Sequence, residues 1–221
     1  MHRVHGPSKY TAGVTIRSRR KPQSDAAGLP LSQGFPPLGA RHARVLVLGS
    51  LPGQASLAAG QYYAQPQNAF WRIMGALLDA GPALPYAERV ARLERASVAV
   101  WDVLAAGQRA GSLDSAIVRS TAVVNDFQSL FRRHAAISLV CFNGRTAEHL
   151  YLRRVHADLP ARAQAIPLHR LPSTSPAHAG MPFAAKLERW SILLEHLRAS
   201  SRDHRAATYR GVTRAHAPSP N

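Results

Sequence analysis

The chain has 221 residues, 46% of them hydrophobic, which is enough for one α/β domain with extended ends. Cys141 is its only cysteine, so an internal disulfide and any cysteine-ligated zinc or iron–sulfur site within the chain are excluded. No apolar run approaches the ~20 residues of a membrane span and no signal peptide is visible, so we expect a soluble, cytoplasmic protein without membrane contacts.

The formal net charge of the chain is +16. Such a charge suits a polyanionic partner through Coulomb attraction and the release of counterions from phosphate. Nearly all of it comes from arginine, and a general bias toward arginine would give the same charge without a nucleic-acid partner. Charge alone therefore leaves both interpretations open.

The two ends of the chain differ from its middle. Residues 1–30 and 200–221 carry basic, Gly, Ser and Pro residues without apolar periodicity, which predicts two basic disordered tails. The folded domain is therefore expected over residues 31–199.

Apolar patterns alternate between strand and helix along this domain. The run Arg44–Leu48 is short, continuous and apolar, which is typical of a strand covered on both faces. Further strands are predicted at 98–101, 137–142 and 164–167, and helices at 70–78, 86–95, 126–134, 146–155 and 183–197. This order predicts an α/β fold, with three layers (α/β/α) around a central, mainly parallel four-stranded sheet. In such sheets ligands bind beyond the carboxyl ends of the strands, so the loops after Leu48, Phe142 and Pro167 are searched for a site.

The first of these loops is Gly49-Ser50-Leu51-Pro52-Gly53. It contains neither a G-x-G-x-x-G fingerprint nor a Gly-Lys-Ser/Thr phosphate loop, so a nucleotide cofactor loses its main support. A tight turn here would bring backbone N–H groups and the Ser50 hydroxyl against a ligand. A purely structural turn is the competing interpretation.

Aromatic and amide side chains gather in the next segment, residues 60–71. A loop tyrosine such as Tyr63 can stack on an extruded base, which is worth ~1–3 kcal/mol per base, or it can belong to the core, as Phe70 and Trp71 are expected to. Asn68 precedes a predicted helix, where Asn is a common N-cap. Tyr63 and Asn68 thus each keep a structural and a functional interpretation.

Asn143 closes the predicted strand at 137–142. An amide at that position can read a base edge, because it offers an acceptor beside two donors. The pair Asn143-Gly144 is also an ordinary turn. The nearby Cys141 has no obvious activating neighbour and is interpreted as a buried thiol.

The last loop, residues 171–180, places small hydroxyl residues between prolines. Such a loop can hold DNA phosphates and push a wedge into the space left by an extruded base. An ordered connection with Ser and Thr caps is the alternative, and His178 alone is interpreted as a surface residue. The 11 histidines include no H-x-x-x-H pair, so no metal site is expected.

Together these segments resemble the hypoxanthine-DNA glycosylase branch of the uracil-DNA glycosylase superfamily over about residues 34–195. Segments 101–104 (Trp-Asp-Val-Leu) and 111–114 (Gly-Ser-Leu-Asp) contribute to the resemblance. The main motifs are Gly49-Ser50-Leu51-Pro52-Gly53, Tyr62-Tyr63-x-x-Pro66-x-Asn68-x-Phe70-Trp71, Phe142-Asn143-Gly144 and Leu171-Pro172-Ser173-Thr174-Ser175-Pro176-Ala177.

The resemblance implies roles for individual residues. Asn68 would position the water that attacks C1′, and Asn143 would read or polarise the base, so both would be catalytic. Gly49, Ser50 and Tyr63 would bind the base together with Asn143. Contacts to DNA would come from Pro52, Ser173, Thr174, Ser175, Pro176, His178 and Lys186.

Three positions depart from the pattern that the resemblance leads us to expect. Ser50 stands where many superfamily members place Asp or Asn, which shifts the burden of orienting water to Asn68. Leu171 replaces the histidine that would stabilise the leaving base, so weak leaving-group help is expected. His178 stands where this branch would have Asn.

The implied activity is single-step hydrolysis of the N-glycosidic bond of a deaminated base, with hypoxanthine favoured. The enzyme would need no metal or other cofactor and would act as a monomer on double-stranded DNA. Because Asn68 has no useful pKa, the rate should depend only mildly on pH near neutrality. Three alternatives stay open: excision of uracil or 5-hydroxymethyluracil, a non-catalytic nucleic-acid-binding module, and a small-molecule nucleoside hydrolase.

Overall fold

The computed structural model describes residues 28–199 of the chain. The two expected tails therefore lie outside the described residues, except for positions 28–30. The central element is a parallel sheet with strand order β3-β2-β6-β7. Its strands are β2 (Val45–Gly49), β3 (Val98–Asp102), β6 (Leu139–Asn143) and β7 (Leu168–Leu171).

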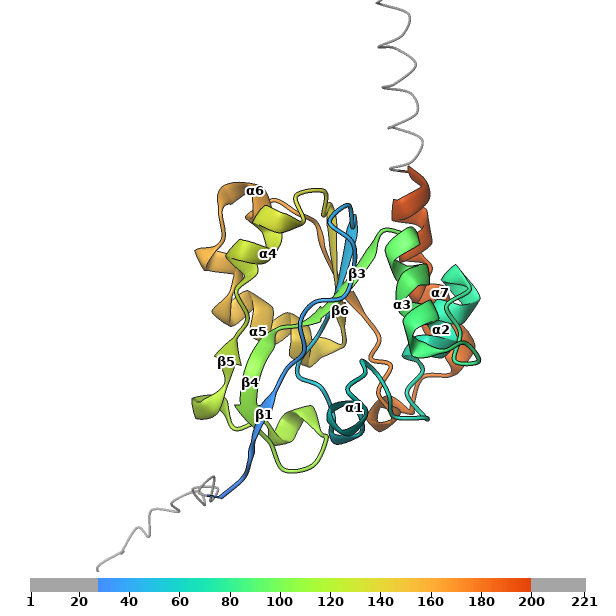
Figure 1. Ribbon diagram of the computed structural model, residues 1–221. Coiled ribbons are helices and arrows are strands. Elements are labelled where there is room, and N and C mark those ends of the chain that lie inside the picture. The colour runs from blue at the N-terminus through green and yellow to red at the C-terminus, as the bar shows by residue number, and fades with distance from the viewer. Residues whose placement is uncertain (1–27, 200–221) are drawn as a thin grey trace, which may run out of the picture.

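Helices cover both faces of this sheet, as Figure 1 shows. Helices α4, α5 and α6 lie on one side, and α2, α3 and α7 lie on the other. Because both faces are covered, all five residues of β2 and of β3 are buried, which explains their continuous apolar sequences. The predicted α/β/α sandwich around a four-stranded parallel sheet is confirmed. The helices are α1 (Gln54–Ala59), α2 (Phe70–Leu78), α3 (Tyr86–Arg95), α4 (Phe127–Arg133), α5 (Arg145–Arg154), α6 (Ala161–Gln164) and α7 (Phe183–Trp190).

A second, antiparallel sheet was not expected from the sequence. It has the order β1-β4-β5, with β1 at Leu31–Gln33, β4 at Leu104–Gln108 and β5 at Val123–Val124. These strands have two to five residues, too few for a clear alternation of apolar and polar positions. Strand β4 begins two residues after β3 ends, so the small sheet continues the chain directly from the edge of the large one.

Two predicted elements differ from the structure. A strand was expected at 164–167, but these residues form the end of α6 and the loop that connects it to β7. Strand β7 begins only after them, at Leu168–Leu171. Pro160 caps the start of α6, and Pro167, which has no N–H for a strand ladder, stands just before β7. The helix expected at 183–197 is interrupted after Trp190 by a turn at Ser191, and residues 192–199 are helical again.

The core lies between the sheet and its helices, and it contains Cys141 on β6. Burial raises the pKa of this thiol to about 12, so it is protonated at neutral pH. The interpretation of Cys141 as a buried thiol is confirmed. Within residues 28–199, none of the helices has the length and apolar character needed to cross a membrane.

Candidate active site

Three adjacent strands end in one row of residues at the carboxyl edge of the parallel sheet. Gly49 on β2 pairs with Asp102 on β3, and Asn143 on β6 follows the pair Leu48 and Phe142. Gly49 therefore lies in the middle of the row, with Asp102 on one side and Asn143 on the other. Neighbouring strands are about 4.8 Å apart, so roughly 10 Å separates the backbones of Asp102 and Asn143.

A pocket of about 450 Å³ opens at this edge. Its volume lies within the range of about 300–1,000 Å³ that is usual for small-molecule sites. Of the site residues expected from sequence, those that line it are Gly49, Ser50, Pro52, Tyr63, Asn68, Asn143, Ser173, Thr174, Ser175, Pro176 and His178. Residues from four loops that are distant in sequence thus surround one cavity.

The Asn143 amide is held by two hydrogen bonds to Thr174. Its Nδ2 donates to Thr174 Oγ1 at 2.8 Å, and its Oδ1 accepts from the Thr174 backbone N–H at 2.8 Å. Because a backbone N–H can only donate, the carbonyl oxygen of the amide must face it, which fixes the orientation of the amide. One N–H and one oxygen lone pair of Asn143 are not used by these two bonds, and the Tyr63 hydroxyl lies close enough to interact with the Asn143 side chain.

Thr174 also connects the two asparagines of the site. Its carbonyl accepts a hydrogen bond of 2.9 Å from the backbone N–H of Ala69, the residue that follows Asn68. Asn68 Oδ1 in turn accepts from Phe70 N at 3.0 Å, at the start of α2. The N-cap of α2 is Ala69, so Asn68 is not the N-cap expected from sequence but precedes it and binds the first N–H of the helix. Its Nδ2 group and one oxygen lone pair are not used by this bond.

Tyr63 lies in the pocket wall with an unusual backbone conformation. Its φ is 55°, in the left-handed region, and its ring stacks on Phe70 with 4.0 Å between centroids and 22° between planes. The preceding Tyr62 belongs to the core, where its hydroxyl donates to the carbonyls of Phe35 and Pro36. Tyr63 is therefore both packed on the core and part of the pocket lining.

Two acidic residues of the pocket were assigned no role from sequence. Asp114, the first residue of a short 3-10 helix (Asp114–Ala116), accepts a hydrogen bond of 2.6 Å from Ser50 Oγ. Asp102 ends β3 and is only 4% exposed. A polar residue that closes a buried apolar strand is the signal that drew attention to Asn143, and the same signal could have identified Asp102.

Arg109 binds both the loop after β2 and Asp114. Its guanidinium donates to the carbonyl oxygens of Leu51 and Pro52 and forms an ion pair of 3.6 Å with Asp114. The side chain of Arg109 is 1% exposed, whereas that of Asp114 is 40% exposed. The loop after β2 is thus fixed to the small sheet through one buried guanidinium.

Comparison with known proteins identifies the family of the chain. The sequence profile described as the uracil DNA glycosylase superfamily matches residues 36–198. The chain belongs to that superfamily. Two relatives, both described as hypoxanthine DNA glycosylase, come from Methanosarcina barkeri (38% identity; 51% of this chain and 71% of that relative) and Methanosarcina acetivorans (37%; 53% and 73%). A solution structure from Methanosarcina acetivorans, described as a candidate uracil DNA glycosylase, superposes with a TM-score of 0.63 at 31% identity and covers 76% of this chain and 99% of its own.

Two positions of this superfamily member differ from the DNA-contact roles expected for them. Lys186 is 5% exposed, does not line the pocket, and donates to the carbonyl of His178 at 2.8 Å. Thr174 is 1% exposed and uses its N–H, hydroxyl and carbonyl inside the protein. Both side chains are placed to hold the loop at 171–180 rather than to meet a phosphate. Ser173, Ser175, Pro176 and the exposed His178 keep an open position in the pocket lining.

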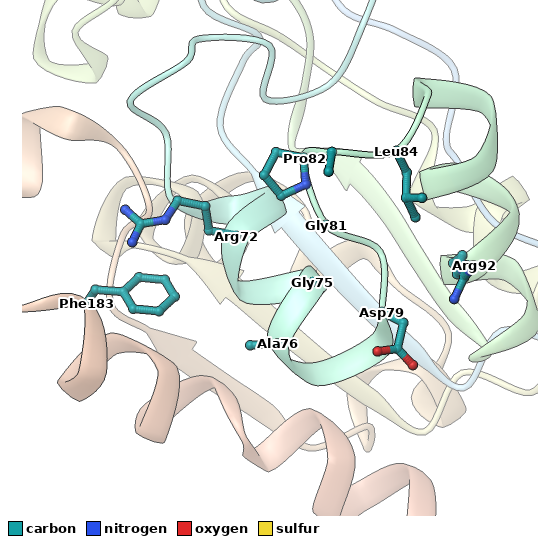
Figure 2. Close-up of a pocket in the computed structure, with 10 residues that line it drawn as sticks. Arg72, Gly75, Ala76, Asp79, Gly81, Pro82, Leu84, Arg92 and Phe183 are labelled. Carbon is teal, nitrogen blue, oxygen red and sulfur yellow. The ribbon is translucent and has the colours of Figure 1, made fainter.

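A separate cavity of about 540 Å³, shown in Figure 2, lies between α2, α3 and the start of α7. The Arg72 guanidinium lies over the Phe183 ring, 4.3 Å from its centroid, and Arg92 pairs with Glu88. This cavity is not lined by any of the site residues expected from sequence. The pocket at the carboxyl edge of the sheet, which those residues do line, is therefore the candidate active site.

Proposed function

We propose that this superfamily member is a DNA glycosylase that hydrolyses the N-glycosidic bond of a deaminated base, with hypoxanthine as the preferred base. The observation that carries the proposal is the convergence of Tyr63, Asn68 and the fixed Asn143 amide on one pocket. The names of the two relatives support the choice of base. Such an enzyme must first flip the target nucleotide out of the duplex into a pocket of this kind.

Base selection follows from the orientation of Asn143. Its free oxygen lone pair can accept from a ring N–H, and its free N–H can donate to a neighbouring carbonyl oxygen. Hypoxanthine offers this pair as N1–H beside O6, and uracil offers it as N3–H beside O4. Adenine presents the reverse order, which would require the amide to rotate. Its bonds to Thr174 oppose that rotation, so undamaged adenine is disfavoured.

Hydrolysis would proceed through an oxocarbenium-like sugar. Asn68 would orient the attacking water through the part of its amide that the bond to Phe70 leaves unused. An amide does not remove a proton at neutral pH, so its contribution is orientation and electrostatics. Tyr63, supported from behind by Phe70, would stack on the extruded base.

We further propose double-stranded DNA as the substrate, bound by a single copy of the chain in the cytoplasm. A groove of about 640 Å³ shares Asp114 with the pocket and is lined by His149 and the four arginines Arg119, Arg145, Arg153 and Arg154. Arg145, His149 and Arg153 are exposed and spaced four residues apart, so they follow one side of α5. The first of these residues, Arg145, directly follows Asn143-Gly144. The basic side of α5 is therefore placed to bind phosphates next to the flipped nucleotide.

The test is an excision assay on duplexes that carry one deoxyinosine, one deoxyuridine or no lesion, followed by alkaline cleavage of abasic sites. The expected result is strand cleavage at deoxyinosine, slower cleavage at deoxyuridine, and none at normal bases. Faster cleavage at deoxyuridine would replace hypoxanthine by uracil as the preferred base. Intact duplexes throughout, with DNA still bound, would show a non-catalytic binding module and overturn the proposal.

A further inference from the structure

The pocket lining contains two buried polar atoms that have no hydrogen-bond partner in the described part of the chain. They are Asp102 Oδ2 and the Tyr63 hydroxyl. A buried donor or acceptor without a partner costs about 1–3 kcal/mol, and more when the group is charged. Native proteins keep such atoms where a ligand or an ordered water completes them. The Tyr63 hydroxyl still lies close to the Asn143 side chain, so Asp102 Oδ2 is the atom of the pocket that most needs a ligand or a water to complete it.

Both groups lie against Gly49 in the middle of the strand row. A Cβ at Gly49 would collide with Asp102 Oδ1 and would stand 3.2 Å from the Tyr63 hydroxyl. Because Gly49 has no side chain, the Asp102 carboxyl can occupy the space beside it. Strand order places Asp102 on the far side of Gly49 from Asn143, so a base above Gly49 has an amide toward one edge and a carboxyl toward the other.

An acid in the pocket would help the base to leave. A purine departs more easily when one of its ring nitrogens is protonated, because negative charge then does not build up on the base. The position expected to hold a stabilising histidine is Leu171, which is 1% exposed and apolar. Asp102 is the buried acid on the opposite side of the strand row.

We propose that Asp102 is a second catalytic residue, whose protonated carboxyl hydrogen-bonds the extruded base and gives its proton to a ring nitrogen as the C1′–N bond breaks. This inference rests on the proposed function. The electron pair of the broken bond goes to the base, which leaves as the neutral molecule. Water adds its oxygen to C1′ and releases one proton, which returns to the Asp102 carboxylate directly or through solvent. The sum is one water consumed, with one base and one abasic site formed.

The surroundings of Asp102 favour its protonated form at neutral pH. Burial and the nearby Asp114 raise its pKa to about 7, and Arg109 opposes the rise only in part. The remaining titratable groups that face it are Tyr62 and Tyr63, whose pKa values are raised by burial and by the Asp102 carboxylate, so both stay neutral. A carboxyl with a pKa near the working pH is suited to proton transfer, since both of its forms are accessible.

This role changes the expected pH dependence. Excision should be fast below pH 7 and should fall about tenfold per pH unit above it, as Asp102 loses its proton. From Asn68 alone we expect an excision rate that changes only mildly with pH. With Asp102 as the acid, such a flat profile is expected only for a variant that lacks the Asp102 carboxyl. General acids typically contribute about 10²–10⁴-fold to a rate.

The test is single-turnover excision from pH 5 to 9 by the native chain, Asp102→Asn and Asp114→Asn. Asp79→Asn is the matched control, because Asp79 is an exposed carboxyl that lines the separate cavity in Figure 2, and Asn tolerates its left-handed conformation (φ 56°). DNA affinity and melting temperature are measured for each variant. Asp102→Asn should be at least ~10²-fold slower at pH 6, with a flat profile and native DNA affinity. Asp114→Asn should shift the falling limb to lower pH, because it removes a charge that raises the pKa of Asp102.

Each other outcome has a definite meaning. If the native chain removes no base from any duplex, the proposed function itself is wrong. If the native chain cuts but Asp102→Asn cuts equally fast at pH 6, or if native excision rises with pH, the acid role of Asp102 is overturned while the proposed function stands. If Asp102→Asn does not fold, the Asp114→Asn shift decides alone, and an unshifted falling limb overturns the inference.

Discussion

The Asn143 amide and Thr174 are joined by two hydrogen bonds of 2.8 Å, one to the Thr174 hydroxyl and one from its backbone N–H. The two residues come from different loops, 31 positions apart in sequence. Because the Thr174 carbonyl also accepts from Ala69 N, this pair connects the base-reading amide to the segment that holds Asn68. The geometry of one asparagine is therefore set by the loop that also anchors the other.

Replacing Thr174 by Val should weaken excision. The variant keeps the backbone bond to Asn143 Oδ1 but removes the acceptor for Nδ2, a loss of about 1 kcal/mol that corresponds to a roughly fivefold to tenfold lower excision rate. Thr174→Ser retains the hydroxyl and should excise at nearly the native rate. Single-turnover rates on a deoxyinosine duplex measure the effect, and equal rates for Val and native protein would contradict the proposed locking of the amide.

Asn68→Ala should lower the excision rate by at least about 10²-fold, because the attacking water loses its orientation. The variant also loses the hydrogen bond to Phe70 N at the start of α2, at a cost of ~1 kcal/mol of stability. Asn68→Asp keeps an acceptor for that N–H and separates the two effects in thermal melts. DNA affinity should be unchanged in the Ala variant, whereas the added negative charge of Asn68→Asp should weaken it. An Ala variant that is destabilised but fully active would leave Asn68 only the structural role of holding the start of α2.

Asp102→Asn should be more stable than the native chain at high pH. The pKa of Asp102 is raised from 3.8 to about 7 in the folded protein, so the folded state holds this proton more tightly than the unfolded chain does. The associated stability is fully present below about pH 4 and is lost as the pH rises through 7. Asn carries no charge at any pH. Its advantage in free energy of unfolding, measured with urea, should therefore be larger at pH 8 than at pH 5 by roughly 3 kcal/mol.

If the free energies of unfolding of the native chain and Asp102→Asn differed by the same amount at pH 5 and pH 8, the raised pKa of Asp102 would be contradicted. Asp79→Asn, which replaces an exposed carboxyl by an amide, is the control for the effect of the substitution itself.

Arg145→Ala and Arg153→Ala should each weaken DNA binding and reduce the slope of log K against log salt by about 0.9. The physical reason is the loss of one phosphate contact and the counterion release that accompanies it. Arg95→Ala, at an exposed position on α3 on the other side of the sheet, is the control and should leave the slope unchanged. Fluorescence anisotropy between 50 and 200 mM salt measures the slopes. Equal slopes for all four proteins would remove the groove along α5 from the DNA path.

The sequence was sufficient for the main sheet and most of its helices. Continuous apolar runs such as Val45–Leu48 and Val98–Trp101 have one simple explanation, strands covered on both faces, and Tyr86–Arg95 shows its helix by periodicity. The antiparallel sheet and the position of β7 were missed. Very short strands carry little periodic signal, and they form because neighbouring backbone is already in place to pair with them.

For the site, the sequence determined which residue types were present at the strand ends and in which order, and this was enough to expect Asn68, Tyr63 and Asn143 in one pocket. Only the tertiary structure decided what each group is free to do. It commits Thr174 and Lys186 to internal hydrogen bonds, fixes the Asn143 amide in one orientation, and buries Asp102 beside Gly49 and Asp114. Residue type determines which bonds and charges a side chain can offer. Burial and the neighbours brought close by folding determine which of these remain available and in which protonation state.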